Sequence, residues 1–307
     1  MTLKREQAVQ LWLPALAHFA ATGPVRALLL RADQLPDGAS GFLAGLREYF
    51  PDIDTSLPAG ALTREFIAHD AGDALWLAAD PAWARPDING IRLMACGHLQ
   101  LDMAQAQALA TPLLPVFAEA GMQLQVSTPE HWHVRLPANT VLPEFSAPEQ
   151  AMGEDLSQHM PQGPAGKRWR LLLNEVQVAL HQNPLNAARH ARRMVPVNTL
   201  WLWGGGRLPK PVRTELRGVI SDDVLLSAVA QRAGLEPQSR TSANIGRASA
   251  GWLIDLQDVA AGDVEAQWWS ILEPLATRQP LALNFASGER WLRRPWHRWR
   301  LWRRAPR

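Results

Sequence analysis

The stretch that decides the fold is Asn174–Pro209, which reads NEVQVALHQNPLNAARHARRMVPVNTLWLWGGGRLP. Apolar residues recur at helical spacing up to Leu180, and Pro184 ends that helix. The apolar run at residues 199–203 has the length of a buried strand. A helix, a polar segment, a buried strand and then glycines are typical of a binding site at the carboxyl end of a sheet strand.

Polar side chains are unusually dense along this stretch. They are Asn174, Glu175, His181, Asn186, Arg189, Arg192, Arg193 and Asn198. Gly204, Gly205 and Gly206 then remove every side chain where the strand ends, which allows a tight turn or the close approach of an anion to backbone N–H groups. The alternative for any single residue is a solvated helix face followed by a plain turn.

Strands and helices alternate along the rest of the chain. After an opening helix, the pattern predicts strands at 25–30, 73–79, 90–96, 122–127, 131–136, 251–256 and 281–286. It predicts helices at 40–50, 61–68, 103–121, 222–233 and 264–278. Strands separated by helices of this length indicate a layered α/β fold with a mostly parallel sheet flanked by helices.

The length of 307 residues is sufficient for one large body. We expect a single α/β body over residues 1–289, with residues 58–136 as a candidate smaller inserted lobe. Residues 137–166 are rich in Pro, Gly, Ser and Gln, which predicts a long surface loop or a lid. Residues 290–307 form a separate Arg/Trp-rich C-terminal segment.

The single cysteine, Cys96, excludes an internal disulfide and indicates a reducing compartment. It lies in an apolar strand, so we expect a buried, inert thiol. No stretch reaches the ~18 apolar residues that span a bilayer. Polar residues interrupt the opening MTLKREQAVQLWLPALAHFA, which favours an amphipathic helix over a signal peptide. A cytoplasmic protein with no transmembrane segment is the expectation.

The C-terminal segment RWLRRPWHRWRLWRRAPR holds eight arginines and no acidic residue. Without those eight charges the net charge of +2 becomes −6 for residues 1–289. Three interpretations compete: contact with nucleic acid, contact with an anionic membrane surface, or indoles packed on the acidic body while the segment covers a sheet edge. The third is preferred for the first half of the segment.

Two further stretches resemble known proteins together with residues 174–209. One is Gly72–Trp76 followed by Asp80, Arg85, Asp87 and Asn89, and the other is residues 217–234, a strand, an acidic pair and a helix. The three together resemble the archaeal-type cofactor-independent phosphoglycerate mutases of the alkaline-phosphatase-like superfamily. They resemble still more the related bacterial RpfE-type regulatory proteins. The resemblance implies a layered α/β fold of that superfamily.

The resemblance also implies what a working mutase of this kind needs. Such enzymes hold two divalent metals with several Asp and His residues and use a Ser or Thr to carry the phosphoryl group. Here the N-terminal segment TLKREQAVQLWLPALAHFAATG has no aspartate. His131 and His133 would share one face of a strand, but this pair without a carboxylate is a weak metal signature. We therefore expect neither a binuclear metal site nor mutase activity of the usual kind.

The preferred hypothesis is a non-catalytic regulatory or ligand-binding protein on a mutase-like scaffold without a cofactor. It would bind either a small anionic, phosphorylated ligand or a protein partner. Guanidinium and amide groups donate the hydrogen bonds that a phosphorylated anion accepts. The predicted anion ligands are Arg85, Asn89, Asn186, Arg189, Arg193, Asn198, Gly204, Gly205 and Gly206. An accompanying polar site would comprise Asp80, Asp87, Glu175 and His181.

The second hypothesis is a metal-dependent enzyme, a phosphoglycerate mutase or phosphatase with a rearranged site. Asp80, Asp87, His131, His133 and Glu175 would then supply acid, base or metal contacts, with manganese or zinc as the cofactor. A third hypothesis is a nucleic-acid accessory protein that acts through residues 290–307.

Overall fold

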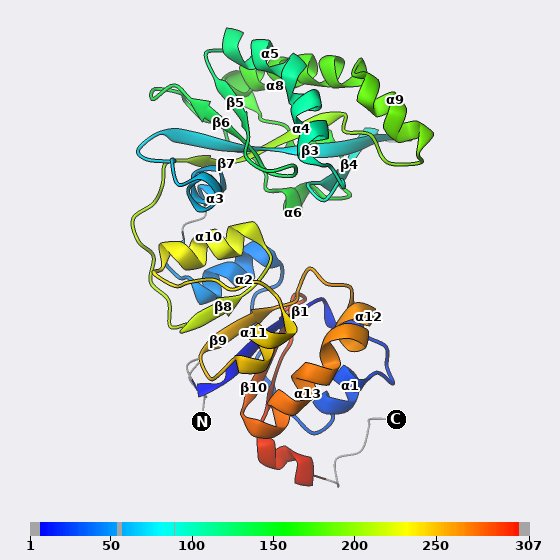
Figure 1. Cartoon of the computed structure of the whole chain (residues 1–307), viewed down its shortest axis with the longest axis vertical. Coiled ribbons are helices and arrows are strands. Elements are labelled where there is room, and N and C mark those ends of the chain that lie inside the picture. The colour runs from blue at the N-terminus through cyan, green and yellow to red at the C-terminus, as the bar shows by residue number, and fades with distance from the viewer. Residues whose placement is uncertain (1–6, 54–56, 89, 301–307) are drawn as a thin grey trace. The chain divides into compact units, whose positions relative to one another are not determined.

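The computed structural model describes residues 7–53, 57–88 and 90–300, in two compact units that are treated separately below (Figure 1). Unit 1 comprises residues 1–54 and 211–307, and unit 2 comprises residues 55–210. Both units are sheets flanked by helices, so the predicted α/β fold is confirmed.

Unit 1 is built on a six-stranded mixed sheet. In spatial order its strands are β2 (Asp33–Leu35), β11 (Arg290–Arg293), β10 (Leu281–Phe285), β1 (Val9–Leu13), β9 (Trp252–Asp255) and β8 (Gly218–Ile220). The last four are mutually parallel, and β11 is antiparallel to both of its neighbours. The predicted parallel sheet is therefore found in this unit.

Helices cover both faces of this sheet (Figure 1). They are α1 (Pro24–Leu29), α2 (Phe42–Tyr49), α10 (Val224–Arg232), α11 (Ser242–Arg247), α12 (Ala261–Asp263) and α13 (Trp269–Arg278), with the 3₁₀ helices η2 (Leu16–His18) and η5 (Pro295–Trp299) and the π-helix η4 (Val264–Trp268). Successive side chains of β1 point to opposite faces. Leu11 joins the core formed with α1, α11 and α13, whereas Trp12 stacks on Phe42 of α2 at 5.4 Å between ring centroids.

Two predictions for unit 1 are wrong. The expected opening helix is strand β1, whose five residues are all buried between β10 and β9. A central strand apolar on both faces cannot be distinguished from a buried helix by periodicity. The expected strand at 25–30 is helix α1, which begins at Pro24. Proline fits the first turn of a helix because that turn needs no N–H donor there.

Unit 2 is built on an antiparallel sheet centred on β3 (Leu75–Asp87). The other strands are β4 (Gly90–Cys96), β5 (Gln123–Val126), β6 (Trp132–Leu136) and β7 (Thr199–Gly206). Strand β3 pairs with β6 through residues 75–78, with β4 through residues 82–87, and with β7 through residues 76–82. The predicted parallel character does not extend to this sheet, because its strands connect largely as neighbouring hairpins.

The helices of unit 2 cover this sheet and enclose a core (Figure 1). They are α3 (Ala59–Ala68), α4 (Met103–Ala110), α5 (Leu114–Glu119), α6 (Pro148–Ala151), α7 (Leu156–His159), α8 (Gly163–His181) and α9 (Pro184–Ala191), with the turn η3 (Thr111–Leu113). The sequence interpretation placed a smaller lobe at 58–136. The unit extends to residue 210 because α8 packs on the sheet and β7 pairs with β3.

The segment at 137–166, expected as a loop or lid, contains α6 and α7 and lies against β4. Gly153 N–H donates to Leu93 O at 2.8 Å, and the Trp201 indole N–H donates to Ser146 O at 3.0 Å. Several backbone groups of this segment thus form hydrogen bonds with the sheet or with each other, because buried N–H and C=O groups need hydrogen-bond partners.

The first half of the C-terminal segment adds strand β11 to the sheet of unit 1, between β10 and β2. Its arginines pair with carboxylates, Arg290 with Glu48 and Arg294 with Asp33. The indole of Trp291 packs edge-on against Phe285 at 5.5 Å, as the preferred interpretation expects. The segment does not cover a sheet edge, because β11 lies between two strands, and Trp296 in the same half is exposed. In the described part of the chain no helix has the length and apolar character needed to cross a membrane.

Candidate functional site

A groove in unit 2 lies between helix α8 and the sheet and has a volume of about 420 Å³. From α8 it is lined by side chains that recur at helical spacing: Asn174, Gln177, Val178, His181 and Gln182. From the sheet it is lined by Ala84, Pro86, Ile91 and Asn198. The result is an apolar floor with amide and imidazole groups around it, in the size range of small-molecule sites.

Asn198 stands immediately before β7 and closes one end of the pairing between β7 and β3. Its Oδ1 accepts the backbone N–H of Ala84 at 2.8 Å, and its Nδ2 donates to Ala84 O at 2.7 Å. Its own backbone N–H donates to Ala82 O at 3.1 Å. An amide nitrogen carries two N–H groups, so one donor of Asn198 remains for a bound ligand.

Two residues of the predicted site, His181 and Asn198, therefore meet in one groove. Arg85 lies between Ala84 and Pro86 on β3, and strand alternation turns it to the opposite face from these two groove residues. Asp87 pairs with Arg92 at 2.6 Å on the surface. Asn89 lies outside the described residues. Glu175 is exposed on α8 but does not line the groove.

Asn186 and Arg189 use their polar groups to hold the fold. Asn186 donates from Nδ2 to Leu180 O and Val197 O, both at 2.8 Å, and its Oδ1 accepts the Val197 N–H at 2.9 Å. Arg189 is 1% exposed and donates to Val195 O at 2.9 Å and to Leu99 O at 2.6 Å. Burial lowers the pKa of this guanidinium.

The remaining predicted anion ligands are placed differently from each other. Arg193 is exposed in a turn after α9 with a φ of 57°. Gly204, Gly205 and Gly206 lie inside β7 rather than in a turn, which corrects that expectation. A Cβ on Gly204 would lie 2.5 Å from Ala59 Cβ, and one on Gly206 would lie 2.6 Å from Pro58 Cβ. The glycines thus allow the start of α3 to approach the strand.

A second polar cluster in unit 2 is centred on the predicted pair His131 and His133. The two imidazoles have different partners: His131 Nδ1 lies 3.5 Å from the buried carboxylate of Asp80, which also accepts the Trp203 indole N–H at 2.8 Å. His133 is 0% exposed and lies in hydrogen-bond contact with Ser127 and with Thr63.

The hydrogen-bond directions around His133 follow from its neighbours. The Thr63 hydroxyl donates to Ala59 O at 2.7 Å, so Thr63 Oγ1 accepts from His133 Nε2 at 2.8 Å. His133 Nδ1 then accepts from Ser127 Oγ at 2.7 Å, and Ser127 Oγ accepts from Arg64 at 2.8 Å. Burial lowers the pKa of His133 to about 4, and these hydrogen-bond directions are those of a neutral ring.

Sequence reasoning missed Thr63, Arg64 and Ser127. Arg64 also forms a bidentate ion pair with Asp70 and lies over the Trp76 ring at 5.0 Å. These residues come from α3 and from the end of β5, which meet His133 only through tertiary packing. Nothing in the local sequence around them carries that signal.

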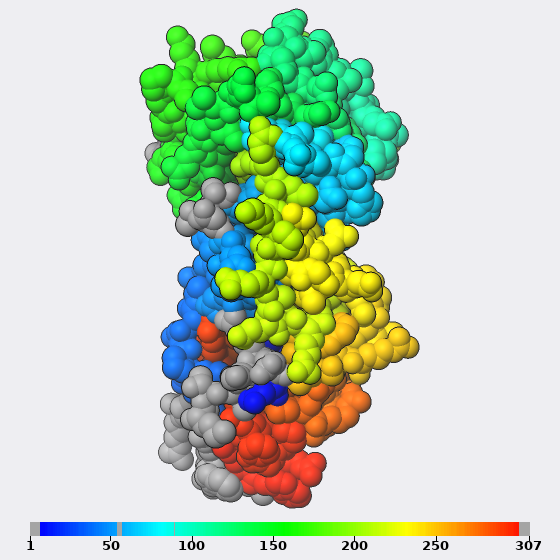
Figure 2. All heavy atoms as spheres, turned by 90° about the vertical axis from the view of Figure 1, so that its left-hand side faces the viewer, coloured from blue at the N-terminus to red at the C-terminus, as the bar shows by residue number. Residues whose placement is uncertain are grey.

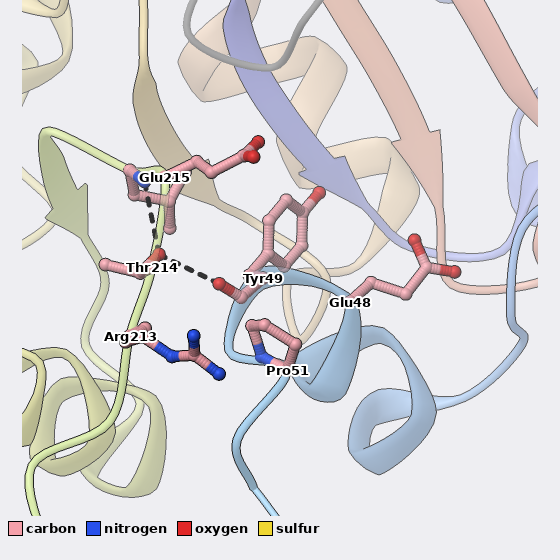
Figure 3. A pocket seen from close by; sticks show the side chains of 7 residues that line it. Glu48, Tyr49, Pro51, Arg213, Thr214 and Glu215 are labelled. Atoms are coloured by element: carbon pink, nitrogen blue, oxygen red, sulfur yellow. Dashed lines mark hydrogen bonds between the residues drawn. The ribbon is translucent and has the colours of Figure 1, made fainter.

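Unit 1 has a hollow of about 360 Å³, lined by Glu48, Tyr49, Pro51, Arg213, Thr214, Glu215 and Leu216 (Figure 3). Several of these groups are already held by the fold. The Thr214 hydroxyl donates to Tyr49 O at 2.8 Å, and Arg213 forms a bidentate pair with Asp52 at 2.7 and 2.8 Å. These hydrogen bonds lower the pKa of Asp52 to about 2. The hollow is therefore a joint between the end of α2 and the segment 213–216 of unit 1.

The carboxyl ends of parallel strands β8 and β9 carry a third cluster. Asp255 is fully buried, and burial followed by repulsion from Asp223 and Asp258 raises its pKa to about 7. Ser221 donates to Asp255 Oδ2 at 2.7 Å, and Arg240 pairs with Asp258 at 2.6 Å and approaches Asp255 at 3.8 Å. Over residues 7–53, 57–88 and 90–300, no three His, Cys, Asp or Glu residues are grouped so that they could hold a metal ion.

Cys96 is the chain's one thiol and lies at the end of β4. Burial, and then the negative charge of Asp80, raise its pKa well above the usual value. A thiol in such surroundings stays protonated and is a poor nucleophile.

Comparison with known proteins shows partial similarity to phosphoglycerate mutases, and no protein-family model matches the chain. A probable 2,3-bisphosphoglycerate-independent phosphoglycerate mutase of Geobacter sulfurreducens is 34% identical over 71 residues, 23% of this chain and 17% of that protein. The 2,3-bisphosphoglycerate-independent mutase of Methanosarcina mazei is 32% identical over 98 residues, 30% of this chain and 25% of that protein. The chain thus matches at most a quarter of the length of these two curated relatives, and its homology to them is partial.

Two solved structures are similar over most of the chain. The PH0037 protein from Pyrococcus horikoshii has a TM-score of 0.49 with 11% identity, covering 95% of this chain and 87% of that one. The cofactor-independent phosphoglycerate mutase from Thermoplasma acidophilum has a TM-score of 0.39 with 12% identity, covering 93% and 89%.

Proposed function

We propose that this protein binds a small anionic ligand in the groove between α8 and the sheet of unit 2. The observation that carries the proposal is the convergence of His181 with the amides of Asn174, Gln177 and Asn198 around one hollow of about 420 Å³. A carboxylate or phosphate oxygen would accept hydrogen bonds from the imidazole and the amide N–H groups. The apolar floor formed by Ala84 and neighbouring residues would cover the carbon skeleton of such a ligand.

Among the hollows of the protein, this groove has polar side chains that remain accessible. Asn174, His181 and Gln182 are exposed at its rim. In the hollow of unit 1, by contrast, Arg213 and Thr214 are held by Asp52 and Tyr49. Polar groups that are not engaged in hydrogen bonds within the protein can replace a hydrogen bond to water by one to a ligand with little loss of free energy.

We place the protein with the RpfE-type regulatory proteins and assign it a cytoplasmic, non-catalytic role. The three stretches that resemble that family and the partial homology to the mutases support the assignment. The inert single thiol supports a reducing compartment. In this role the protein would be regulated by a phosphorylated ligand that occupies the groove. Arg193, which the sequence predicted as an anion ligand, lies outside the groove.

A metal-dependent phosphoryl-transfer enzyme is the second candidate, and the sequence match to the mutases favours it. The carboxyl edge of the parallel sheet, with Ser221 and Asp255, is where such a scaffold would carry its chemistry. A cation of the protein already faces these carboxylates, because Arg240 pairs with Asp258 at 2.6 Å and approaches Asp255 at 3.8 Å. No catalytic step is therefore assigned to a metal.

The two candidates are separated by a thermal-shift screen run beside an activity assay. The screen would use phosphorylated three-carbon acids, nucleotides and inorganic phosphate, and the assay would measure mutase and phosphatase turnover with added manganese or zinc. Binding without turnover supports the proposal. Turnover that depends on stoichiometric metal would replace it with the enzyme.

A further inference from the structure

The end of the described chain forms a cationic and aromatic surface on unit 1. On the 3₁₀ helix η5, Trp296 is 58% exposed and Trp299 is 64% exposed. Three residues complete one turn of a 3₁₀ helix, so these two indoles lie on the same side of η5. The atoms of this segment, red in Figure 2, lie at the surface of the molecule.

Each exposed indole is accompanied by a guanidinium. Arg294 lies over the Trp296 ring at 5.5 Å, and Arg298 lies over the Trp299 ring at 4.9 Å. Cation–π contact holds these side chains as paired flat units, with an apolar ring and a positive charge side by side. Such a unit suits a boundary where hydrocarbon meets negative charge.

The positive charge behind these indoles is only partly compensated. Asp33 accepts hydrogen bonds from both Arg294 and Arg300, at 2.8 and 2.5 Å, so one carboxylate serves two guanidiniums. Arg293 is buried, and its Nε and Nη1 have no hydrogen-bond partner in the described part of the chain. The neighbouring charges of Arg31 and Arg300 add to its burial in lowering the pKa of Arg293.

Arg31 contacts the same cluster, and an exposed leucine precedes it in the sequence. Arg31 hydrogen-bonds to Arg298 O and receives a hydrogen bond from Arg300 on its own carbonyl, both at 3.4 Å. Leu30, directly before it at the end of α1, is 36% exposed. Aliphatic surface contributes to burial in lipid, whereas nucleic acid would gain little from it.

We infer that Trp296, Trp299, Arg294 and Arg298 form an interfacial membrane-binding surface for anionic phospholipid headgroups. Indoles favour the headgroup level of a bilayer, and arginines near the surface are attracted by anionic lipids. Single-stranded nucleic acid would also meet a positive charge and two rings, and the experiment below separates it from lipid. The two exposed indoles, and the exposed Leu30 next to Arg31, favour the lipid surface.

The test is flotation of the full chain with large unilamellar vesicles of phosphatidylcholine alone and of phosphatidylcholine with 30% phosphatidylglycerol. We expect at least tenfold stronger partitioning to the anionic vesicles at low salt, and a marked loss at 0.5 M salt because screening shortens the range of the attraction. The Trp296→Ala/Trp299→Ala variant should lose at least tenfold, and Arg298→Glu severalfold. These side chains are exposed, and circular dichroism would verify that the variants fold.

Matched controls are Ile88→Ser and Arg192→Glu, which remove an exposed apolar side chain and an exposed arginine of unit 2. Both should partition like the unmodified protein. Equal binding to the two vesicle types, or a double Trp variant that binds as well as its parent, would overturn the inference. A salt-sensitive gel shift with single-stranded oligonucleotides, without any vesicle binding, would also overturn it and assign the surface to nucleic acid.

Discussion

The side-chain amide of Asn198 makes two hydrogen bonds to the backbone of Ala84, accepting at 2.8 Å and donating at 2.7 Å. A side chain thus takes the place of a strand residue and continues the pairing of β7 with β3 beyond Thr199. Both residues line the groove on unit 2. The same amide therefore fixes the wall of the proposed site and keeps one N–H that Ala84 does not use.

Replacing Asn198 should loosen this wall. Asn198→Ala leaves two backbone groups of Ala84 without partners and should lower the free energy of unfolding by about 1–3 kcal/mol. Asn198→Asp keeps the size but cannot donate to Ala84 O, so it should cost a similar amount. Urea unfolding of both variants measures the effect. Losses below about 0.5 kcal/mol would show that the amide does not hold the strand end.

Gly204 should be intolerant of any side chain. Its φ is +59°, and an added Cβ would lie 2.5 Å from Ala59 Cβ and 2.9 Å from Ala59 N. Gly204→Ala should cost about 3 kcal/mol from combined backbone strain and overpacking. The control is Gly72→Ala, with a φ of +50° and nothing within 4 Å of the added Cβ, which should cost only about 1 kcal/mol. Equal effects in thermal unfolding would refute the close approach of α3 to β7.

The buried, neutral His133 should make the protein sensitive to acid. Its pKa is about 4 in the folded protein against 6.5 when exposed, so the unfolded chain binds more protons between these values. The free energy of unfolding should therefore fall as the pH drops from about 6.5 to 4, by about 3 kcal/mol for this group. His297 has a similarly lowered pKa, so His133→Gln should remove only part of this pH dependence. An unchanged slope would contradict the neutral-ring assignment.

Asp255 should act in the opposite direction. Its pKa is raised from 3.8 to about 7, so the folded protein binds more protons than the unfolded chain between these values. The free energy of unfolding contributed by this group should fall as the pH rises from about 4 to 7. Asp255→Asn should remove that fall and stabilise the protein at pH 8 by up to about 4 kcal/mol. Asp258→Asn removes one of the two neighbouring negative charges that raise this pKa, so it should reduce the fall in part while Asp255→Asn abolishes it.

Much of the fold was predictable from local patterns. The helix ending before Pro184 and the short apolar strand that follows are α8 and β7. One error concerns β1, which is buried on both faces and therefore lacks the alternation of apolar and polar residues that identifies a strand. The other concerns the short apolar run after Pro24, which forms a helix rather than a strand. The antiparallel sheet of unit 2 depends on strand pairing, which no local window contains.

The site was predictable only in part, and the reason is tertiary. His181 and Asn198 were chosen for their chemistry and meet in the groove. Asn186 and Arg189 have the same chemistry, but they bond backbone carbonyls of Leu180 and Leu99, segments whose proximity appears only after folding. Polar type identifies candidates, whereas the partner that satisfies each group is set by the packed structure.

The most direct test of the proposed groove is isothermal titration of the full chain with the anionic ligands that shift its melting temperature. The unmodified protein should bind at least one of them, His181→Ala should weaken that affinity at least tenfold, and His190→Ala, an exposed histidine of α9 outside the groove, should leave it unchanged. Equal affinities in all three proteins, or no heat with any ligand of the panel, would contradict a binding site between α8 and the sheet.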